Sequence, residues 1–178
     1  MKLKTYHPDQ IEEIKALFTK TFSDSEGEAE GAVIGELANE LLTTTNSKDL
    51  RGFVAMEEKK IIGSILFTTL TFENGPSAFL LSPVAVHTDY QKQGIGQKLI
   101  RFGLQALKEE GVELAFTYGD PDYYSRVGFQ QISEDVAKAP LVLSYPHGWL
   151  YQSLSGAEIT AIPGESYCVS ALNKQAYW

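Results

Sequence analysis

The sequence predicts an α+β (mixed α/β) fold, in which most strands pair antiparallel and one crossover creates a parallel pair. Residues 52–56, 61–72 and 79–86 are apolar or β-branched segments separated only by short polar turns, which is typical of an antiparallel meander. A helical segment then separates residues 79–86 from the apolar segment 112–118, and this strand–helix–strand order predicts parallel pairing. The two patterns together favour one mixed sheet.

Length and composition indicate a single domain covering residues 1–178. The chain can bury a sizeable core, with 43% hydrophobic and 21% charged residues. A net charge of −8 argues against a nucleic-acid partner, which needs a basic surface. The charge fits an amine-bearing substrate weakly, and solubility explains it equally well. No apolar run is long enough to span a membrane, and the N-terminus lacks the apolar core of a signal peptide.

The single cysteine, Cys168, restricts the chemistry of the chain. One thiol cannot form a disulfide framework or a zinc cluster within one chain, so we expect no metal site. The lack of a disulfide framework favours a cytoplasmic location. The apolar neighbours of Cys168 favour a buried, inert thiol over a nucleophile.

Two helices are predicted before the strands. Pro8 can start the first helix because the first turn does not need its missing N–H, and apolar residues recur at helical spacing as far as Phe22. The polar segment 23–28 predicts a break. Apolar residues at helical spacing over 34–42 then predict the second helix.

Turn residues separate the strands of the meander. The charged segment 57–60 follows the first strand, and the turn at 74–76 follows the second. Pro83 lies inside the third strand, where it cannot donate to a ladder, so we expect a bulge or a splayed edge there.

The remaining elements follow the same logic. An amphipathic helix carries apolar residues over 99–107 and ends near Gly111, which is placed as a C-terminal cap. After strand 112–118, Asp120 is expected to cap a short helical turn that runs to Arg126, and a strand begins at 128–129. In the tail, 141–143 and 167–169 are strand candidates. Its aromatic residues are expected mainly in the core, with an acceptor pocket or a subunit contact as alternatives: Trp149, Tyr151, Tyr167, Tyr177 and Trp178.

The segment Gln91–Gly96 is the most informative for function. It places two glycines between a strand and a helix N-terminus, an arrangement that aims backbone N–H groups at an anion. A plain glycine turn is the simplest alternative. A dinucleotide fingerprint is disfavoured because Leu99 stands where a third glycine or alanine is needed, and a Walker loop is excluded because no Gly-Lys-Ser/Thr follows.

Two motifs together resemble the GNAT superfamily of N-acetyltransferases. The first is Gln/Arg-x-x-Gly-x-Gly/Ala opening a helix after an apolar strand, present here as Gln91–Gly96 behind Val84–His87. The second is Tyr-x-x-x-Gly-Phe, present as Tyr124–Phe129. The order of elements over residues 3–132 also matches. The local motif Gly-Asp-Pro-x-Tyr-Tyr-x-Arg-x-Gly-Phe resembles that of a bacterial subgroup of small GNAT proteins.

The resemblance implies a fold and an activity. The fold would be a twisted, mostly antiparallel sheet of about six to seven strands with helices on both faces and a splayed parallel strand pair that forms the cofactor cleft. The activity would be transfer of an acetyl group from acetyl-coenzyme A (acetyl-CoA) to a primary amine of a small molecule or peptide by direct attack. The implied cofactor-binding residues are Val84, Ala85, Val86, Gln91, Lys92, Gln93, Gly94, Ile95, Gly96 and Gln97.

Two catalytic roles follow from the same resemblance. The backbone N–H of Val84 would stabilise the oxyanion, and Tyr124 would act as the general acid for the leaving thiolate. The pKa of a phenol is near ~10, and that of a thiol is near ~8.5. A tyrosine therefore stays protonated at neutral pH and can donate to the leaving thiolate. Packing of Tyr124 as a structural aromatic is the alternative.

Other roles stay open on the sequence alone. A water chain and four glutamates are candidates for accepting the proton of the amine: Glu26, Glu28, Glu30 and Glu36. His87 is expected to be structural or near the cofactor. The alternative functions are a CoA or acyl-CoA-binding sensor or interaction module without transferase activity, and transfer of another acyl chain. A homodimer is a further option that the resemblance leaves open.

Overall fold

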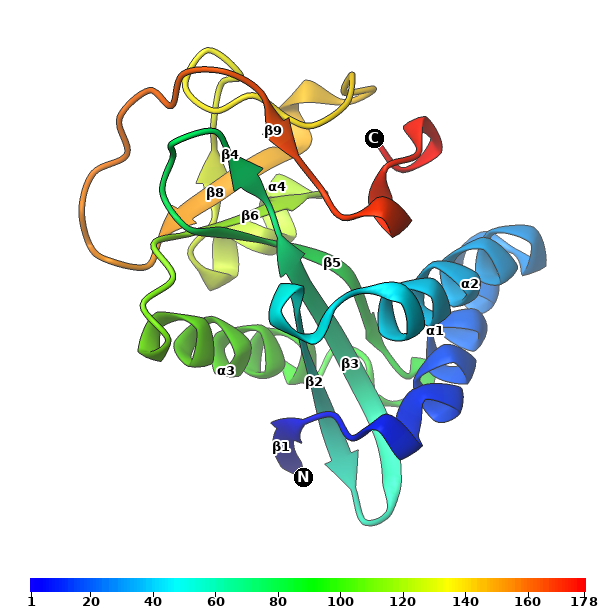
Figure 1. Cartoon of the computed structure of the whole chain (residues 1–178). Coiled ribbons are helices and arrows are strands. Elements are labelled where there is room, and N and C mark those ends of the chain that lie inside the picture. Colours follow the sequence, from blue (N-terminus) through cyan, green and yellow to red (C-terminus); the bar gives the residue numbers. More distant parts are fainter. The chain divides into compact units, whose positions relative to one another are not determined.

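The chain forms nine strands and four α-helices, and the computed structural model describes every residue, 1–178 (Figure 1). In chain order the elements are β1 (Lys2–Thr5), α1 (Ile11–Glu26), α2 (Glu28–Thr44), β2 (Leu50–Glu57), β3 (Lys60–Thr69), β4 (Thr71–Phe72), β5 (Ala78–Val86), α3 (Ile95–Glu109), β6 (Leu114–Tyr118), α4 (Pro121–Tyr124), β7 (Gln130–Gln131), β8 (Trp149–Ser153) and β9 (Ser166–Tyr167). No helix is both long and apolar enough to cross a membrane.

Seven strands form one sheet in the order β1-β2-β3-β5-β6-β8-β7, and β4 pairs with β9 separately. β5 and β6 pair in parallel, from Ala78 opposite Leu114 to Leu81 opposite Thr117. The pairs β1–β2, β6–β8 and β7–β8 are antiparallel. The predicted mixed α/β class, with a mostly antiparallel sheet and one parallel crossover, is therefore confirmed.

The chain falls into two compact units. The first comprises Met1–Phe67 and Pro83–Gly103, and the second comprises Thr68–Ser82 and Leu104–Trp178. β3, β5 and α3 each run from one unit into the other. A single domain over residues 1–178 stays a prediction.

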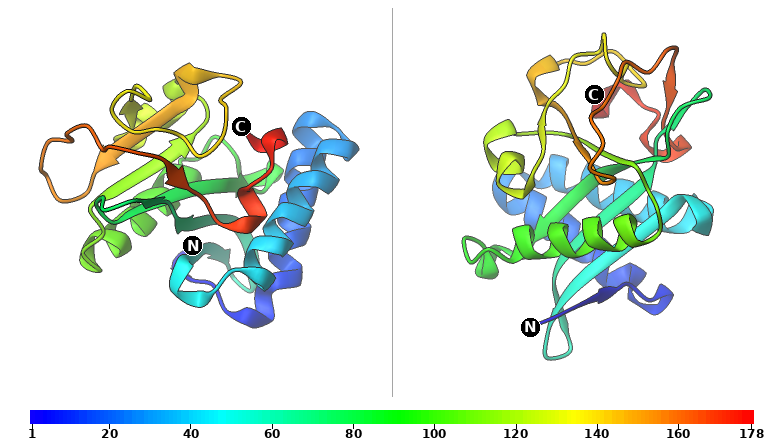
Figure 2. Two further views of the ribbon diagram at one scale, coloured as in Figure 1. Left: turned by 45° about the horizontal axis from the view of Figure 1, so that its top comes forward. Right: turned by 90° about the vertical axis from the view of Figure 1, so that its left-hand side faces the viewer.

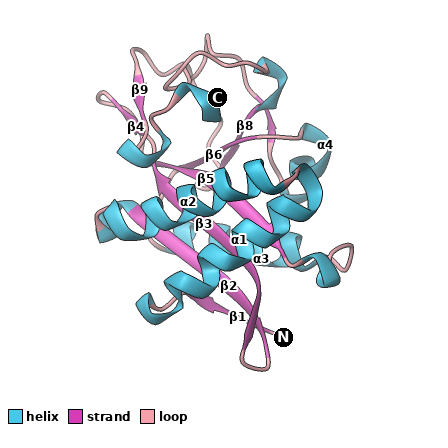
Figure 3. Cartoon of the chain, turned by 90° about the vertical axis from the view of Figure 1, so that its right-hand side faces the viewer, coloured by secondary structure: helices cyan, strands magenta, loops and turns pink.

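In the first unit, helices cover both faces of the β2–β3 pair. Figures 2 and 3 show α3 on one side of these strands and α1 with α2 on the other. Phe102 of α3 packs edge-on against Phe53 of β2, with ring centroids 5.7 Å apart. On α1, Glu13 accepts a hydrogen bond of 2.9 Å from the backbone N–H of Ile61 at the start of β3. Ile14 of α1, Leu41 of α2 and Leu99 of α3 are fully buried, as packing of these helices on the sheet requires.

The first two helices are longer than the sequence predicts. A 3₁₀ turn at Pro8–Gln10 precedes α1, which continues through the polar residues to Glu26. The predicted break over 23–28 is thus wrong except at Gly27, whose φ of 99° and ψ of 159° separate α1 from α2. Polar side chains do not end a helix by themselves, and Lys20 pairs with Asp24 at 2.9 Å along the last turns of α1.

In the second unit, the aromatic residues of the tail build a core. Trp149 is fully buried and stacks on Phe116 with centroids 5.1 Å apart, and Trp178 packs against Trp149 at 6.0 Å. The indole Nε1 of Trp149 donates to the carbonyl of Ala137 at 2.8 Å, which satisfies its buried polar group. The expectation that these residues mainly pack inside is confirmed for both tryptophans, whereas Tyr167 is half exposed.

Two strand predictions need correction, and one strand was not predicted. Residues 141–143 form no strand and Val142 is 78% exposed, whereas the tail strand is β8, which begins at Trp149. The predicted strand 61–72 is interrupted at Leu70, after which β4 leaves to pair with β9. β1 was not predicted, because its four residues show no clear alternation of apolar and polar side chains. Its pairing with β2 is a long-range contact that the local sequence does not reveal.

Candidate active site

The loop before α3 has positive φ angles at alternate residues, a feature that it shares with anion-binding nests. Lys92 and Gly94 both adopt left-handed dihedrals, with φ of 62° and 78°. Gln93, which lies between them, does not have a positive φ. A backbone that alternates in this way can turn successive N–H groups toward one point. A left-handed φ is uncommon for a lysine, and such conformations cluster at functional sites.

The N-terminus of α3 adds further donors at the same place. The carbonyl of Gly94 accepts the first helical hydrogen bond, from the N–H of Lys98 at 3.0 Å. The N–H groups of Ile95, Gly96 and Gln97 therefore belong to the first helical turn, where no intrahelical acceptor exists. Ile95, Leu99 and Ile100 are buried and hold the helix in place. The residues that the family resemblance assigns to the phosphates lie in the loop before α3 and in its first turn, and their role in binding stays a prediction.

Val84, Ala85 and Val86 occupy the last part of β5. Val84 and Val86 are half-buried on one face, whereas Pro83, Ala85 and His87 are buried on the other. Val86 also receives a hydrogen bond at its carbonyl, from the Gln91 side chain at 2.9 Å. The Gln91 amide therefore closes the loop back onto the strand.

The parallel ladder of β5 and β6 stops just before Pro83. Its last pair is Leu81 with Thr117, and the Thr117 hydroxyl donates to the Leu81 carbonyl at 2.8 Å. The Leu81 carbonyl therefore accepts a hydrogen bond from a side chain at the point where the ladder ends. Pro83 cannot continue the ladder, because proline has no backbone N–H to donate. β5 itself goes on to Val86. The interrupted ladder agrees with the irregularity expected at Pro83.

His87 has a structural role in the first unit. Its backbone N–H donates to Ile62 at 2.8 Å, and its Nδ1 accepts from the N–H of Asp89 at 3.1 Å. The imidazole is buried and packs edge-on against Tyr90. These contacts fix the turn that leads into the glycine loop, which agrees with the structural alternative expected for His87.

Asp24 and Thr88 join α1 to the same turn, and neither residue was predicted to have a role from the sequence. The Thr88 hydroxyl donates to the Asp24 carboxylate at 2.6 Å, and Lys20 contacts the same oxygen at 2.9 Å. The hydrogen bond from Thr88, with that from Lys20, holds the pKa of the Asp24 carboxyl below its usual value. The residues are 64 positions apart, so only a tertiary contact reveals them.

Tyr124 ends α4 in the second unit, where the second motif explains its position. Asp120 caps α4, since its Oδ1 accepts from the N–H of Asp122 at 2.9 Å. Gly128 has a φ of 95°, and this turn lets the N–H of Phe129 donate to the Tyr124 carbonyl at 3.1 Å. The Phe129 ring then packs edge-on against that of Tyr124, with centroids 5.8 Å apart.

The surroundings of Tyr124 keep its phenol protonated. Burial raises the pKa of Tyr124 far above its ordinary value, the neighbouring Tyr123 adds to the rise, and a hydrogen bond with Thr117 opposes it. Gly119 makes room for the ring, because a Cβ at that position would lie 2.7 Å from its Cε2. A phenol held in this state can donate a proton or hydrogen bond throughout the neutral range.

The four glutamates considered as bases differ in their contacts. Glu36 forms an ion pair with Lys15 at 3.3 Å and accepts a hydrogen bond from Asn39 at 3.3 Å. Glu26 and Glu28 are exposed on either side of Gly27.

Cys168 is half-buried, and burial raises the pKa of its thiol, which suits an inert role.

The predicted site residues divide between the two units. Those from Val84 to Gln97 lie in the first unit, and Tyr124 lies in the second. The cleft expected between the ends of β5 and β6 would involve both units and stays a prediction.

Comparison with known proteins identifies relatives of the chain. A family model described as an acetyltransferase (GNAT) domain matches residues 48–131. The uncharacterised N-acetyltransferase YjhQ of Escherichia coli is 33% identical over 131 residues, which cover 70% of this chain and 72% of YjhQ. The uncharacterised N-acetyltransferase YhbS of the same organism is 29% identical over 132 residues, or 73% of this chain and 74% of YhbS.

Solved structures share the fold. The crystal structure of E. coli YhbS in complex with CoA has a TM-score of 0.83 at 22% identity, covering 98% of this chain and 92% of that one. A GNAT family acetyltransferase from Brucella melitensis in complex with acetyl-CoA has a TM-score of 0.74 at 24% identity, covering 97% of each chain.

Proposed function

The chain belongs to the GNAT family of N-acetyltransferases, and from this premise we propose that it transfers an acetyl group from acetyl-CoA to a primary amine of a small molecule or peptide. The observation that carries the proposal is the nest formed by the left-handed residues Lys92 and Gly94 ahead of α3. Relatives with CoA or acetyl-CoA bound support the choice of cofactor.

The chain's own residues fit the coenzyme. The N–H groups of the loop and of the first turn of α3 would hold the pyrophosphate, aided by the helix dipole. The segment Val84–Val86 would bind the pantetheine arm through its backbone, with the Val86 carbonyl already engaged by Gln91. The coenzyme supplies an acetyl group activated as a thioester.

Two groups of the chain act on the transfer. The N–H of Val84 stabilises the negative charge that develops on the carbonyl oxygen when the amine attacks. Tyr124 donates a proton or hydrogen bond to the departing sulfur, and its raised pKa keeps that proton available at neutral pH. The amine must also lose a proton, and a water chain or one of Glu26, Glu28, Glu30 and Glu36 would accept it.

Isothermal titration with acetyl-CoA tests the proposal, using two matched glycine variants. Gly94 and Gly111 both have positive φ, 78° and 86°, and a Cβ at either would meet no atom within 4 Å. Both aspartate variants therefore carry a similar backbone strain, but only Gly94→Asp places a carboxylate in the nest. We expect Gly94→Asp to lose binding and Gly111→Asp to keep it.

The outcomes separate the candidate functions. Binding lost only in Gly94→Asp, followed by turnover in a screen of amines, supports the transferase. Binding without turnover of any amine would favour a CoA-binding sensor, the alternative function. Absence of acetyl-CoA binding by the native protein would overturn both.

A further inference from the structure

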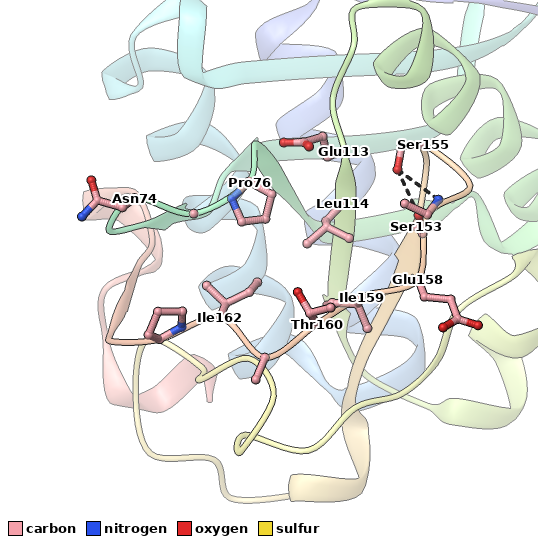
Figure 4. A pocket seen from close by; sticks show the side chains of 14 residues that line it. Asn74, Pro76, Glu113, Leu114, Ser153, Ser155, Glu158, Ile159, Thr160 and Ile162 are labelled. Carbon is pink, nitrogen blue, oxygen red and sulfur yellow. Dashed lines mark hydrogen bonds between the residues drawn. The ribbon is translucent and has the colours of Figure 1, made fainter.

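A pocket of about 300 Å³ lies within the second unit, and none of its lining residues is assigned to the coenzyme or to proton transfer. Three parts of the chain line it: the turn before β5, Glu113 and Leu114 at the start of β6, and the end of β8 with residues of the segment 155–163 that follows it (Figure 4). Its volume is at the lower end of the range for small-molecule sites. We call it the β6 pocket.

The segment 155–163 is anchored near both ends, so the β6 pocket is preformed. At one end the N–H of Leu154 donates to the carbonyl of Glu113 at 2.8 Å. At the other end the N–H of Ile162 donates to Val136 at 2.7 Å, and Ile162 is only 9% exposed. A preformed cavity binds a ligand without a further cost for ordering the loop.

One part of the lining is apolar. Figure 4 shows Pro76 and Leu114 facing Ile159, Thr160 and Ile162 across the opening. Leu114 and Ile162 are buried, and Ile159 is half-buried. Covering this surface with the apolar part of a ligand would stabilise the complex by about 25 cal/mol for each Å² removed from water.

The charged part of the lining is negative. Its ionisable side chains are the carboxylates of Glu113 and Glu158. Glu113 is held in place by Ser77, whose N–H donates to its Oε2 at 2.9 Å, while the N–H of Glu113 donates to the Ser77 hydroxyl at 3.0 Å. The pocket thus presents a fixed negative charge beside an apolar surface, on a protein whose net charge is −8.

We propose that the β6 pocket binds an organic ammonium group with an apolar body, supplied by a free amine or by a lysine side chain of a peptide. The apolar body would lie between Leu114 and Ile159, with the ammonium group toward the carboxylates. This site is independent of the proposed acetyl transfer, because its lining residues are not among those that bind the coenzyme or move protons.

Titration with tryptamine, without any coenzyme, tests the inference. Tryptophol is the matched ligand, since it replaces the ammonium group with a hydroxyl on the same ring and chain. Glu113→Gln keeps an acceptor for the Ser77 N–H, and Glu158→Gln changes an exposed side chain, so both variants should fold. Each should weaken tryptamine binding about three- to fivefold, and together about tenfold or more. Glu12→Gln, an exposed position on α1, controls for net charge.

Ala161→Phe provides a test that leaves the charges unchanged. Ala161 is exposed and lines the β6 pocket, so a phenyl group there should fill the cavity and abolish binding. The proposal is overturned if tryptamine does not bind saturably, if the double glutamine variant binds it as tightly as the native protein, or if tryptophol binds equally well. A parallel titration with N-acetyl-lysine methylamide separates the two sources of the ammonium group by the tighter binder.

Discussion

The Tyr124→Phe variant examines the proposed proton donor most sharply. The substitution removes only the phenol oxygen, so the ring keeps its edge-on contacts with Phe129 at 5.8 Å and with Tyr123 at 5.0 Å. The lost hydrogen bond with Thr117 should lower the free energy of unfolding by about 1 kcal/mol. Positioned proton donors contribute about 10²–10⁴-fold to rate, so we expect kcat to fall at least about 100-fold.

The assay measures release of free CoA with the best amine from the screen. The KM for acetyl-CoA should change little, because the residues proposed to hold the coenzyme lie in the loop before α3 and in β5, not at Tyr124. Tyr123→Phe is the matched control, since it removes a phenol from the neighbouring residue of the same helix and should keep most of the activity. A kcat for Tyr124→Phe within a few-fold of the native value, or an equal loss in Tyr123→Phe, would refute the assignment.

The raised pKa of Tyr124 also has a consequence for stability. The folded state holds the phenol proton more tightly than the unfolded chain, whose tyrosines titrate near pH ~10. This contribution to stability is complete below pH ~10 and is lost as the pH rises toward the folded pKa. Denaturant titrations should therefore show a steeper alkaline loss of stability in the native protein than in Tyr124→Phe. Identical pH profiles would contradict burial of this phenol.

Three further variants address the supporting structure. Gly31→Ala places a Cβ 2.6 Å from the Thr19 carbonyl, so denaturant titration should show a loss of about 1–3 kcal/mol, and an unchanged midpoint would argue against the close α1–α2 contact. Asp120→Ala removes the cap of α4 and should lower the unfolding free energy by about 1 kcal/mol, with Ser as a replacement restoring most of it. Thr88→Val should raise the pKa of the Asp24 carboxyl toward its ordinary value in a carbon-13 NMR titration, whereas an unmoved pKa would deny the contact.

The glycine loop and the Tyr124 motif were predictable because their geometry is local. Gly94 and Gly128 are needed where the chain takes a left-handed turn, and such positions leave a signature in the sequence itself. The cap at Asp120 is of the same kind, since the carboxylate bonds to a backbone group two residues away. Helix and strand periodicity similarly revealed the antiparallel meander and the crossover.

Features that depend on distant contacts were missed. The hydrogen bond between Asp24 and Thr88 joins polar residues that look unremarkable in the sequence, and β8 becomes a strand by pairing with β6 and β7. The β6 pocket likewise needs Glu113 and the segment 155–163 to come together. The cleft expected between the ends of β5 and β6 depends on residues of both units and stays a prediction.

Backbone amide NMR during an acetyl-CoA titration would test the central claim most directly. The account predicts that the amide resonances of Lys92, Gly94, Ile95, Gly96 and Gln97 shift strongly and saturate together, and that inorganic pyrophosphate shifts the same set. Saturable binding of acetyl-CoA that leaves these amides unmoved would contradict a main-chain nest for the phosphates.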